Sequence, residues 1–542
     1  MSKLLVFALL TFLLFLPLSF LPAYSEIKLN VFAILAGLLI WNEPITIQRR
    51  DIPFLMFLMG CLISLIDIRS ISNSWQYLSI WFTGFSFVYW GRSFFKRHQP
   101  TIIQILKIVF WTTVLYILFW IFFHEFAGWG KGKLINEIIP WKVLGKNINM
   151  ATIFPMLLLP LFIFQPVVQK KDLFIRGIAI AIMAYFIYFF NSQMGMLLSV
   201  FYVMGYLAYQ MSLRNFLFIL AGILLLLGMF FNFWIPRLIH FLEIGSFDVR
   251  IQHDISAYRM MKDNPFNGLG LGSYFYEIHT YSDGKEVFLK DHIQNGWTFN
   301  TSMARNHNNL SKLLADIGTI FWTLFIIPVF IEFFSSMKNP EKRNHFVFWV
   351  IFAGFYICSL TLRQSFSDYI ELSEVHLLFF ISYILMTVEG RPSFSLDQNI
   401  LKPIGLVIMA MTFAYFSYNF LTNHYQLKAV AAAKAKNYEK AIELLEPWYH
   451  PVFMTTINEA EPIARHLARW YYCSGNPEKS KFYYKEALSV NPNDPGLKYE
   501  AKNIFKKSCA DYFRTENKKT KKKNKNEVDS KSRKEKKKKE SK

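Results

Sequence analysis

Four side chains that can carry positive charge or donate hydrogen bonds, Arg250, Arg259, Arg305 and His307, lie in one polar segment, residues 237–316. Arginine suits the binding of anions such as phosphate, and an imidazole can transfer a proton near neutral pH. Long apolar stretches flank the segment, so it is predicted to be a loop at a bilayer face, where charges need a functional reason. A lone histidine is more often a structural residue, and that alternative stays open for His307.

The first part of this loop has the pattern of a helix followed by a glycine-rich turn. Residues 250–263 place apolar side chains at helical spacing, and Asn264-Pro265 ends the run. The residues predicted to face the bundle are Ile251, Ile255, Tyr258, Met260 and Met261. Three glycines at alternate positions, 268, 270 and 272, then permit a tight turn or the close approach of a ligand or a helix. They do not form a nucleotide fingerprint, because no strand precedes them and no Gly-Lys-Ser/Thr follows.

A second helix is predicted to begin near Ser302, with His307 on a face beside its apolar stripe. The stripe consists of Leu310, Leu313, Leu314 and Ile317. The histidine would thus stand on an ordered helix, close to Arg305.

The rest of the chain has the composition of a polytopic membrane protein. Hydrophobic residues make up 53% of 542, with 56 Phe and 14 Trp, which is more than a soluble protein usually buries. We therefore predict an all-α membrane helix bundle of about 13 spans. The spans are expected near residues 4–22, 29–41, 53–66, 76–91, 102–123, 152–168, 173–190, 194–209, 215–236, 317–334, 345–361, 373–388 and 402–421.

Basic residues on alternate short loops set the orientation, because such loops stay in the cytoplasm. These residues are Arg49, Arg50, Arg92, Lys96, Arg97, Lys170, Lys171, Arg176, Arg214, Lys338, Lys342 and Arg343. The N-terminus is then cytoplasmic, and the 237–316 loop and everything after Leu421 are extracytoplasmic. The first span can alternatively be a signal peptide, since Ala23-Tyr24-Ser25 resembles a cleavage site, but the orientation is the same either way.

The four cysteines constrain the chain only weakly. Cys61 and Cys358 lie in predicted spans, where they read as small hydrophobic residues. Cys473 and Cys509 would face an oxidising compartment, which leaves a disulfide between them open. Neither a Cys-x-x-Cys nor an Asp-x-Asp motif occurs, so we predict no metal and no cofactor.

The sequence changes character after the last span, and we divide it into a membrane domain over residues 1–423, a helical domain over 424–512 and a tail over 513–542. Two segments of the helical domain, opening at Asn437 and Gly475, resemble tetratricopeptide repeats, with a plain helical hairpin as the alternative. The tail is rich in lysine and has almost no apolar residues, so it is predicted to be disordered and solvated. In an extracytoplasmic tail, its polyanionic partners would be envelope lipids or glycans rather than nucleic acid.

The motifs of the 237–316 loop resemble those of the large periplasmic loop of the O-antigen ligase and O-antigen polymerase superfamily. The resemblance as a whole covers roughly residues 100–390. A weaker signature is similar at residues 145–151, at the start of a span. The motif positions that carry the resemblance are Arg250, Pro265, Gly268, Gly270, Gly272, Tyr274, His307, Asn308 and Gly318.

The resemblance implies a membrane glycosyltransferase that takes a glycan from undecaprenyl diphosphate and passes it to a hydroxyl of lipid A-core, of another glycan or of a protein. It would work at the outer face of a bacterial inner membrane. Arg250 would hold the diphosphate and His307 would be the base, a division of labour that suits a guanidinium and an imidazole. Arg259, Arg305, Asn308 and Arg363 are the candidate substrate-binding residues.

This chain departs from the family pattern at three positions. Gln193, in Ser192-Gln193-Met194-Gly195, stands where the family carries a diphosphate-binding arginine, for which Arg259, Arg305 or Arg363 would substitute. Asp316 replaces the commoner glutamate, and Phe321 stands where a small or hydroxyl residue is frequent. These differences concern the donor more than the reaction class.

The sequence leaves the acceptor open, so an O-antigen ligase is expected, with a polysaccharide polymerase or a protein O-oligosaccharyltransferase as alternatives. A glycan or lipid transporter is the alternative outside the enzymes, although the spans show no internal repeat. Expected partners are the lipid-linked donor, the acceptor, membrane lipid and an envelope protein that binds the repeat domain.

Overall fold

The computed structural model describes residues 2–15, 25–67, 71–122, 148–164, 168–190, 192–229, 247–281, 309–338, 345–361, 374–390, 393–394, 397–450, 463–490, 492, 495–503 and 509. These residues fold into helices and connecting turns, with no strand among them, as predicted for an all-α chain. The chain divides into two compact units, one formed by Met1–Tyr274 with Arg305–Leu421 and the other by Phe275–Ala304 with Thr422–Lys542.

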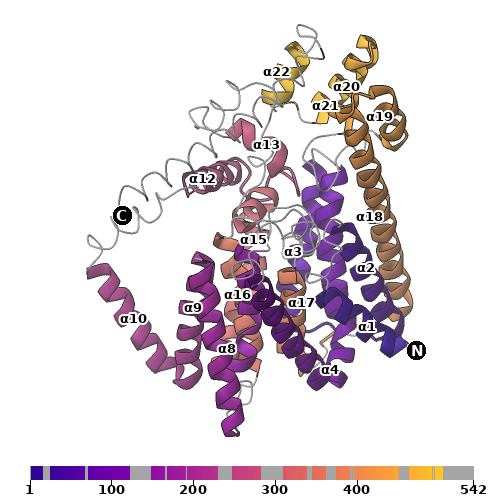
Figure 1. The fold of residues 1–542 in the computed structure, drawn as a ribbon. Coiled ribbons are helices and arrows are strands. Elements are labelled where there is room, and N and C mark those ends of the chain that lie inside the picture. Colours follow the sequence, from indigo (N-terminus) through magenta and orange to yellow (C-terminus); the bar gives the residue numbers. More distant parts are fainter. Residues whose placement is uncertain are drawn as a thin grey trace. The chain divides into compact units, whose positions relative to one another are not determined.

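The first unit is a bundle of apolar helices (Figure 1). Helix α4 packs against α2 and α17, while α15 packs against α3, α12 and α16. Its elements are α1 (Ser2–Phe15), α2 (Ser25–Asn42), η2 (Arg49–Asp51), α3 (Ile52–Ile63), η3 (Ser64–Asp67), α4 (Ile71–Ile121), α6 (Ile148–Leu158), α7 (Pro160–Ile163), α8 (Lys170–Phe189), α9 (Gln193–Gln210), α10 (Leu213–Met229), α12 (Phe247–Asp263), α15 (Asn309–Lys338), α16 (Phe346–Thr361) and α17 (Glu374–Thr387).

Four helices within the described residues are long and apolar enough to cross a membrane, fewer than the predicted spans. They cover Ser74–Phe119, Lys170–Phe189, Leu310–Met337 and Gln398–Lys434. Six shorter apolar helices cover Lys3–Phe15, Ile27–Asn42, Thr152–Ile163, Met194–Gln210, Phe346–Ser359 and His376–Thr387. By length and composition, the chain is therefore consistent with a membrane protein.

Aromatic side chains fill the centre of this bundle. Phe325 of α15 lies 4.8 Å from Phe57 of α3 and 6.1 Å from Phe379 of α17, measured between ring centroids. Phe379 in turn stacks on Phe352 of α16 at 4.9 Å. Offset and edge-on ring pairs of this kind add to the stability gained from burial. The abundance of phenylalanine in the sequence thus serves to join α3, α16 and α17 to α15.

The predicted spans 76–91 and 102–123 are two segments of α4 that meet at a kink, without a loop between them. His98 has non-helical backbone angles (φ −121°, ψ 18°) and lies two residues before Pro100. Proline disfavours a helical conformation in the residue before it and removes a backbone donor, which accounts for the kink.

Arg92 was expected to be one of the cytoplasmic loop charges, but it lies within α4 and its side chain is buried in the bundle. Its guanidinium makes two hydrogen bonds of 2.6 Å to the two carboxylate oxygens of Asp51, and both side chains are at most 1% exposed. The hydroxyl of Tyr383 donates to the same carboxylate at 2.7 Å. Such a bidentate pair satisfies both charges without water and ties η2 to α4 and α17. Of the predicted loop cations beside it, Lys96 and Arg97 are exposed.

The second unit contains short amphipathic helices around a small core of its own. Helix α20 packs against α19 and α21, and α21 packs against α22. Its elements are α19 (Tyr438–Leu445), η9 (Glu446–Trp448), α20 (Ile463–Cys473), α21 (Pro477–Val490) and α22 (Pro495–Asn503), while α13 (Tyr274–Tyr281) and α18 (Gln398–Lys434) each cross a boundary between the units. Helices begin at Tyr438 and Pro477, at the two predicted openings, and the side chain of Asn437 caps the first.

A buried charge cluster and a disulfide hold this unit together. Glu500 accepts hydrogen bonds from Arg465 at 2.7 and 2.9 Å, from Arg469 at 2.8 Å and from the hydroxyl of Tyr484 at 2.8 Å. Burial alone would raise the pKa of Glu500, but the two arginines outweigh it and lower this pKa to about 2.

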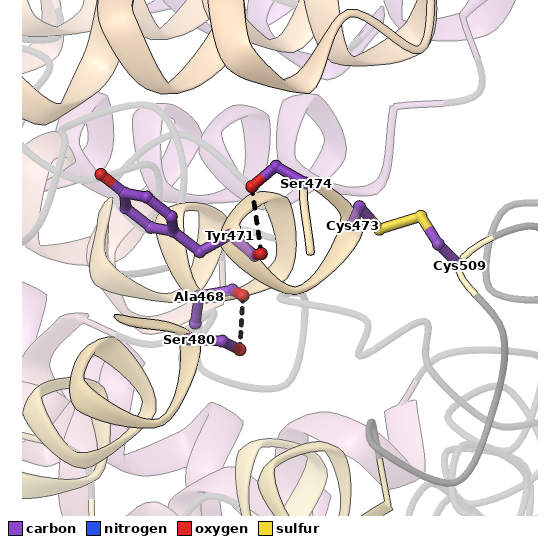
Figure 2. Close-up of a disulfide and its surroundings, with 6 residues drawn as sticks. All are labelled: Ala468, Tyr471, Cys473, Ser474, Ser480 and Cys509. Atoms are coloured by element: carbon purple, nitrogen blue, oxygen red, sulfur yellow. Dashed lines mark hydrogen bonds between the residues drawn. A yellow bond between two sulfur atoms is a disulfide. The ribbon is translucent and has the colours of Figure 1, made fainter. Parts of the chain in front are cut away.

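The disulfide that the sequence left open is formed, between Cys473 at the end of α20 and Cys509 (Figure 2). The hydroxyl of Ser474, next to Cys473, donates to the carbonyl oxygen of Tyr471 at 3.1 Å. Ser480 of α21 donates to the carbonyl oxygen of Ala468 at 2.8 Å and so fastens the two helices beside the disulfide. The bond closes a stretch of 36 residues and so links the segment before the lysine-rich tail to the helical core.

Candidate functional site

The predicted site residues are only partly within the described structure. Arg250 lies in the first turn of α12, but its side chain lies outside the described residues. Arg259 lies two turns later in the same helix and is half-buried. The remaining predicted site residues, Arg305, His307, Asn308 and Arg363, lie outside the described residues. The structure therefore describes the segments next to these residues: helix α12, which carries Arg250 and Arg259, the turn after it, and helix α15, which follows His307 in the sequence.

Helix α12 packs against α15, and its buried face agrees with the prediction only in part, since Met260 is buried as predicted. Ser256, Ala257 and Met260 are buried, at no more than 1% exposure. Ile255 and Tyr258, expected to face the bundle, are 36% and 58% exposed. The pattern of hydrophobic residues failed for Ile255 and Tyr258, and the small residues Ser256 and Ala257 occupy the buried face instead. Figure 1 shows α12 lying across the end of α15.

The end of α12 and the glycine-rich turn agree with the sequence prediction. The helix ends at Asp263, before Asn264-Pro265. Gly268, Gly270 and Gly272 all have positive φ angles, of 68°, 97° and 79°, which side chains with a Cβ atom rarely adopt. The turn brings the chain directly against α15.

The glycine-rich turn and α15 form backbone hydrogen bonds with each other in both directions. Thr319 does not donate its N–H to Ala315 four residues earlier in α15; it donates to the carbonyl oxygen of Pro265 at 2.8 Å. The carbonyl oxygen of Ala315 instead accepts the N–H of Leu269 at 2.9 Å, and that of Asp316 accepts the N–H of Gly270 at 3.0 Å. We call these two segments, residues 265–274 and 315–319, the glycine clasp.

Gly318 makes the exchange possible. Its φ of 76° and ψ of 176° interrupt α15, and a Cβ atom there would lie 2.5 Å from the carbonyl oxygen of Phe266. A Cβ atom on Gly268 would likewise lie 2.5 Å from the backbone nitrogen of Ile317. Only glycine fits at both points. The sequence predicted that the glycines allow the close approach of either a ligand or a helix. In the structure it is a helix, α15, that lies against them.

The side chain of Asp316 completes the clasp. It is buried, and it accepts the N–H of Tyr274 at 2.8 Å, with the N–H groups of Gly272 and Ser273 also directed to it. Consecutive N–H groups in a turn form a concave anion site, and here the protein's own carboxylate fills it. The turn is therefore not a phosphate cradle in this structure.

Two more residues connect the clasp to α4. Ser74 donates its hydroxyl to the carbonyl oxygen of Leu271 at 2.5 Å. Lys312, one turn before Asp316 on α15, is the cation nearest to that carboxylate and hydrogen-bonds to the hydroxyl of Tyr77. The sequence reasoning missed Lys312, although a Lys and an Asp four residues apart at the start of an apolar helix are a usable signal.

Gln193, where the sequence led us to expect a diphosphate-binding arginine, lies at the start of another helix. Gln193 opens α9, where the hydroxyl of Ser192 accepts the N–H of Gly195 at 3.1 Å. A Cβ atom on Gly195 would lie 3.2 Å from Thr152 of α6, so the start of α9 lies beside the segment that follows the signature at residues 145–151. Residues 145–147 of that signature lie outside the described residues.

Phe321 fits because its neighbour on α3 is a glycine. A Cβ atom on Gly60 would lie 2.7 Å from the Cβ atom of Phe321 and closer still to its ring. The large side chain at position 321 is thus accommodated by the absence of one at position 60.

Within the described part of the chain, no group of three or more His, Cys, Asp and Glu side chains is placed to hold a metal ion. Neither a protein-family model nor a curated protein matches the chain. The functional argument therefore depends on the residues of the loop and on the clasp that holds it.

Proposed function

We propose that this protein transfers a glycan from an undecaprenyl-diphosphate carrier to an acceptor hydroxyl at the outer face of a bacterial inner membrane, as a metal-independent glycosyltransferase of the O-antigen ligase type. The observation that carries the proposal is the glycine clasp. It fixes α12, which bears Arg250 and Arg259, against α15, whose first residue follows His307 by two positions. Helices α12 and α15, which are far apart in the sequence, are thereby held together.

The proposed chemistry is a single displacement. The acceptor hydroxyl oxygen forms a bond to the anomeric carbon, the bond from that carbon to the diphosphate oxygen breaks, and His307 accepts the hydroxyl proton. Arg250 neutralises the charge that builds on the leaving diphosphate through two parallel hydrogen bonds. Arg259, Arg305, Asn308 and Arg363 are assigned to substrate binding, and the products are the glycoside and undecaprenyl diphosphate.

The proposed setting is a multi-pass membrane protein of about 13 spans, with the 237–316 loop and the C-terminal domain outside the cytoplasm. The disulfide between Cys473 and Cys509 supports this side for the second unit, since stable disulfides form in oxidising compartments. The second unit is proposed to be a tetratricopeptide-like domain that binds an acceptor or an envelope protein.

The acceptor distinguishes the alternatives within this class. A ligase would modify lipid A-core, a polymerase another glycan and a protein O-oligosaccharyltransferase a polypeptide. Purified full-length protein should be supplied with a lipid-linked glycan and each acceptor in turn. Release of undecaprenyl diphosphate together with a glycosylated acceptor supports transfer, whereas movement of intact lipid-linked glycan across a vesicle membrane would support a transporter.

Substitutions in the loop test the assigned roles. Arg250→Lys should keep the charge but lose the planar fork, and with it most of the activity. His307→Ala should lower transfer roughly 100-fold or more, the usual contribution of a general base. Arg214→Lys on α10 and His424→Ala on α18 are matched controls outside the loop. Transfer per folded molecule that stays normal in both Arg250→Lys and His307→Ala would overturn the assignment.

A further inference from the structure

We propose that the glycine clasp fixes the cationic helix α12 on α15, and that Asp316 is the positioning residue that keeps the clasp closed. This inference rests on the proposed function, because it concerns how the groups of that transfer reaction are held. Asp316 acts through the backbone of the turn, where its contacts are N–H groups.

Three backbone hydrogen bonds of the clasp join the turn after α12 to α15. The bonds from Thr319 to Pro265, from Leu269 to Ala315 and from Gly270 to Asp316 are 2.8–3.0 Å long. Backbone groups have no rotamers, so these bonds fix the end of α12 on α15 more tightly than side-chain contacts would. The fixed point lies two residues beyond the end of α12 at Asp263.

This exchange of hydrogen-bond partners is costly unless something holds the turn in place. Opening α15 at Gly318 gives up helical hydrogen bonds next to the buried residues Ala315 and Asp316, where unpaired backbone groups are unfavourable. Asp316 directs its carboxylate at the N–H groups of residues 272–274. A charged acceptor makes stronger hydrogen bonds than a neutral one, so the carboxylate holds the turn in register.

Residues of α15 and α4 support Asp316 and the turn that it binds. Lys312 lies one turn before it on α15, and Tyr77 of α4 hydrogen-bonds to Lys312. Ser74, also on α4, fixes the carbonyl oxygen of Leu271 in the middle of the turn. With this support, the buried carboxylate of Asp316 keeps the turn of residues 272–274 in a fixed position on α15.

The expected consequence of removing the charge falls on kcat. Asp316→Asn replaces one of the two accepting carboxylate oxygens with an NH₂ group and removes the negative charge, so the turn would lose part of its hold and α12 would shift against α15. A displacement of about 1 Å at a catalytic group can lower the rate about 100-fold. The arginines themselves remain, so KM for the lipid-linked donor should stay near the wild-type value. Asp316→Glu keeps the carboxylate and should recover part of the lost kcat.

The test uses full-length protein in lipid nanodiscs with a lipid-linked glycan and an acceptor that wild type modifies. Asp316→Asn and Asp316→Glu are compared with Asp263→Asn, an exposed carboxylate at the end of α12. Amide hydrogen exchange at residues 265–274 and 315–319 is measured on the same samples, because it reports the clasp without depending on activity. Gly318→Ala is a second way to open the clasp, with Gly177→Ala, where a Cβ atom meets nothing within 4 Å, as its control.

We expect slow exchange at Leu269, Gly270 and Thr319 in wild type, and faster exchange with a lower kcat in Asp316→Asn and Gly318→Ala. Wild-type kcat in variants whose clasp amides exchange fast would overturn the positioning role. Fast exchange of those amides in active wild-type protein would overturn the clasp itself. A wild type that transfers no glycan to any acceptor refutes the proposed function instead, and that result is visible before any substitution is made.

Discussion

Replacing both Cys473 and Cys509 with serine should destabilise the second unit while leaving the first unit folded. The disulfide closes a stretch of 36 residues. On the chain-entropy model, a loop of that length restricts the unfolded chain by about 13 cal/mol/K, or about 4 kcal/mol at 25 °C. For a domain of this size that corresponds to a fall in Tm of roughly 15–30 °C.

The assay is limited proteolysis of the full-length protein across a temperature series, with the fragments from residues 422–509 followed separately from those of the first unit. Reductant should reproduce the loss in wild type and add nothing in the double-serine variant, which serves as the matched control. Thiol labelling of cells before lysis checks that the bond forms in vivo. A second unit that melts at the wild-type temperature in the double-serine variant would refute the entropy argument, and free thiols in labelled cells would place the unit in a reducing compartment.

Three further predictions concern the charge cluster, the topology and the second unit. Glu500→Gln leaves the buried Arg465 and the partly buried Arg469 without their carboxylate and should cost the second unit about 3–5 kcal/mol. The loss is measured as the fall in the urea concentration at which the second unit becomes sensitive to protease. Because the pKa of Glu500 is lowered to about 2, its contribution is complete above about pH 4.3 and is lost as the pH falls towards 2, which an acid titration of wild type against Glu500→Gln should show. A reporter active only outside the cytoplasm should be active when fused after Asn300 or Pro492 and silent after Lys342, and silence at Pro492 alone would contradict an extracytoplasmic second unit. Deleting residues 426–510 should weaken transfer to the native acceptor, and full activity in that variant would make the second unit dispensable.

The sequence predicted the elements of the site better than their packing. The end of α12 before Asn264-Pro265 and the turn at Gly268 follow from local rules, because proline and glycine restrict the backbone on their own. Ile255 and Tyr258 of α12 were predicted wrongly to face the bundle, because hydrophobicity alone favours them, whereas the structure buries Met260, as predicted, together with the small residues Ser256 and Ala257. Such a preference depends on the shape of the partner helix.

Pairings between distant residues were beyond the reach of local patterns. Arg92 looked like a loop charge because a basic residue after an apolar run usually is one, and its partner Asp51 lies 41 residues away. The exchange at Gly318 has no signature in the sequence, since a glycine within a helix can also be a simple packing residue. Glu500 with Arg465 and Arg469 was missed for the same reason, because the ion pairs join α22 to α20.

The contact of Gly60 with Phe321 also restricts how this chain can change over generations. A side chain at position 60 would meet the Cβ atom of Phe321 at 2.7 Å, so residues 60 and 321 should vary together among descendants of a common ancestor. The order of change matters as well. Shrinking position 321 first leaves unfilled space beside Gly60, at less than the cost of removing a fully buried aromatic because Phe321 is only partly buried, whereas enlarging position 60 first makes a side chain clash with Phe321. Lineages that regain a small residue at 321 should therefore pass through a loosely packed ancestor before position 60 can grow.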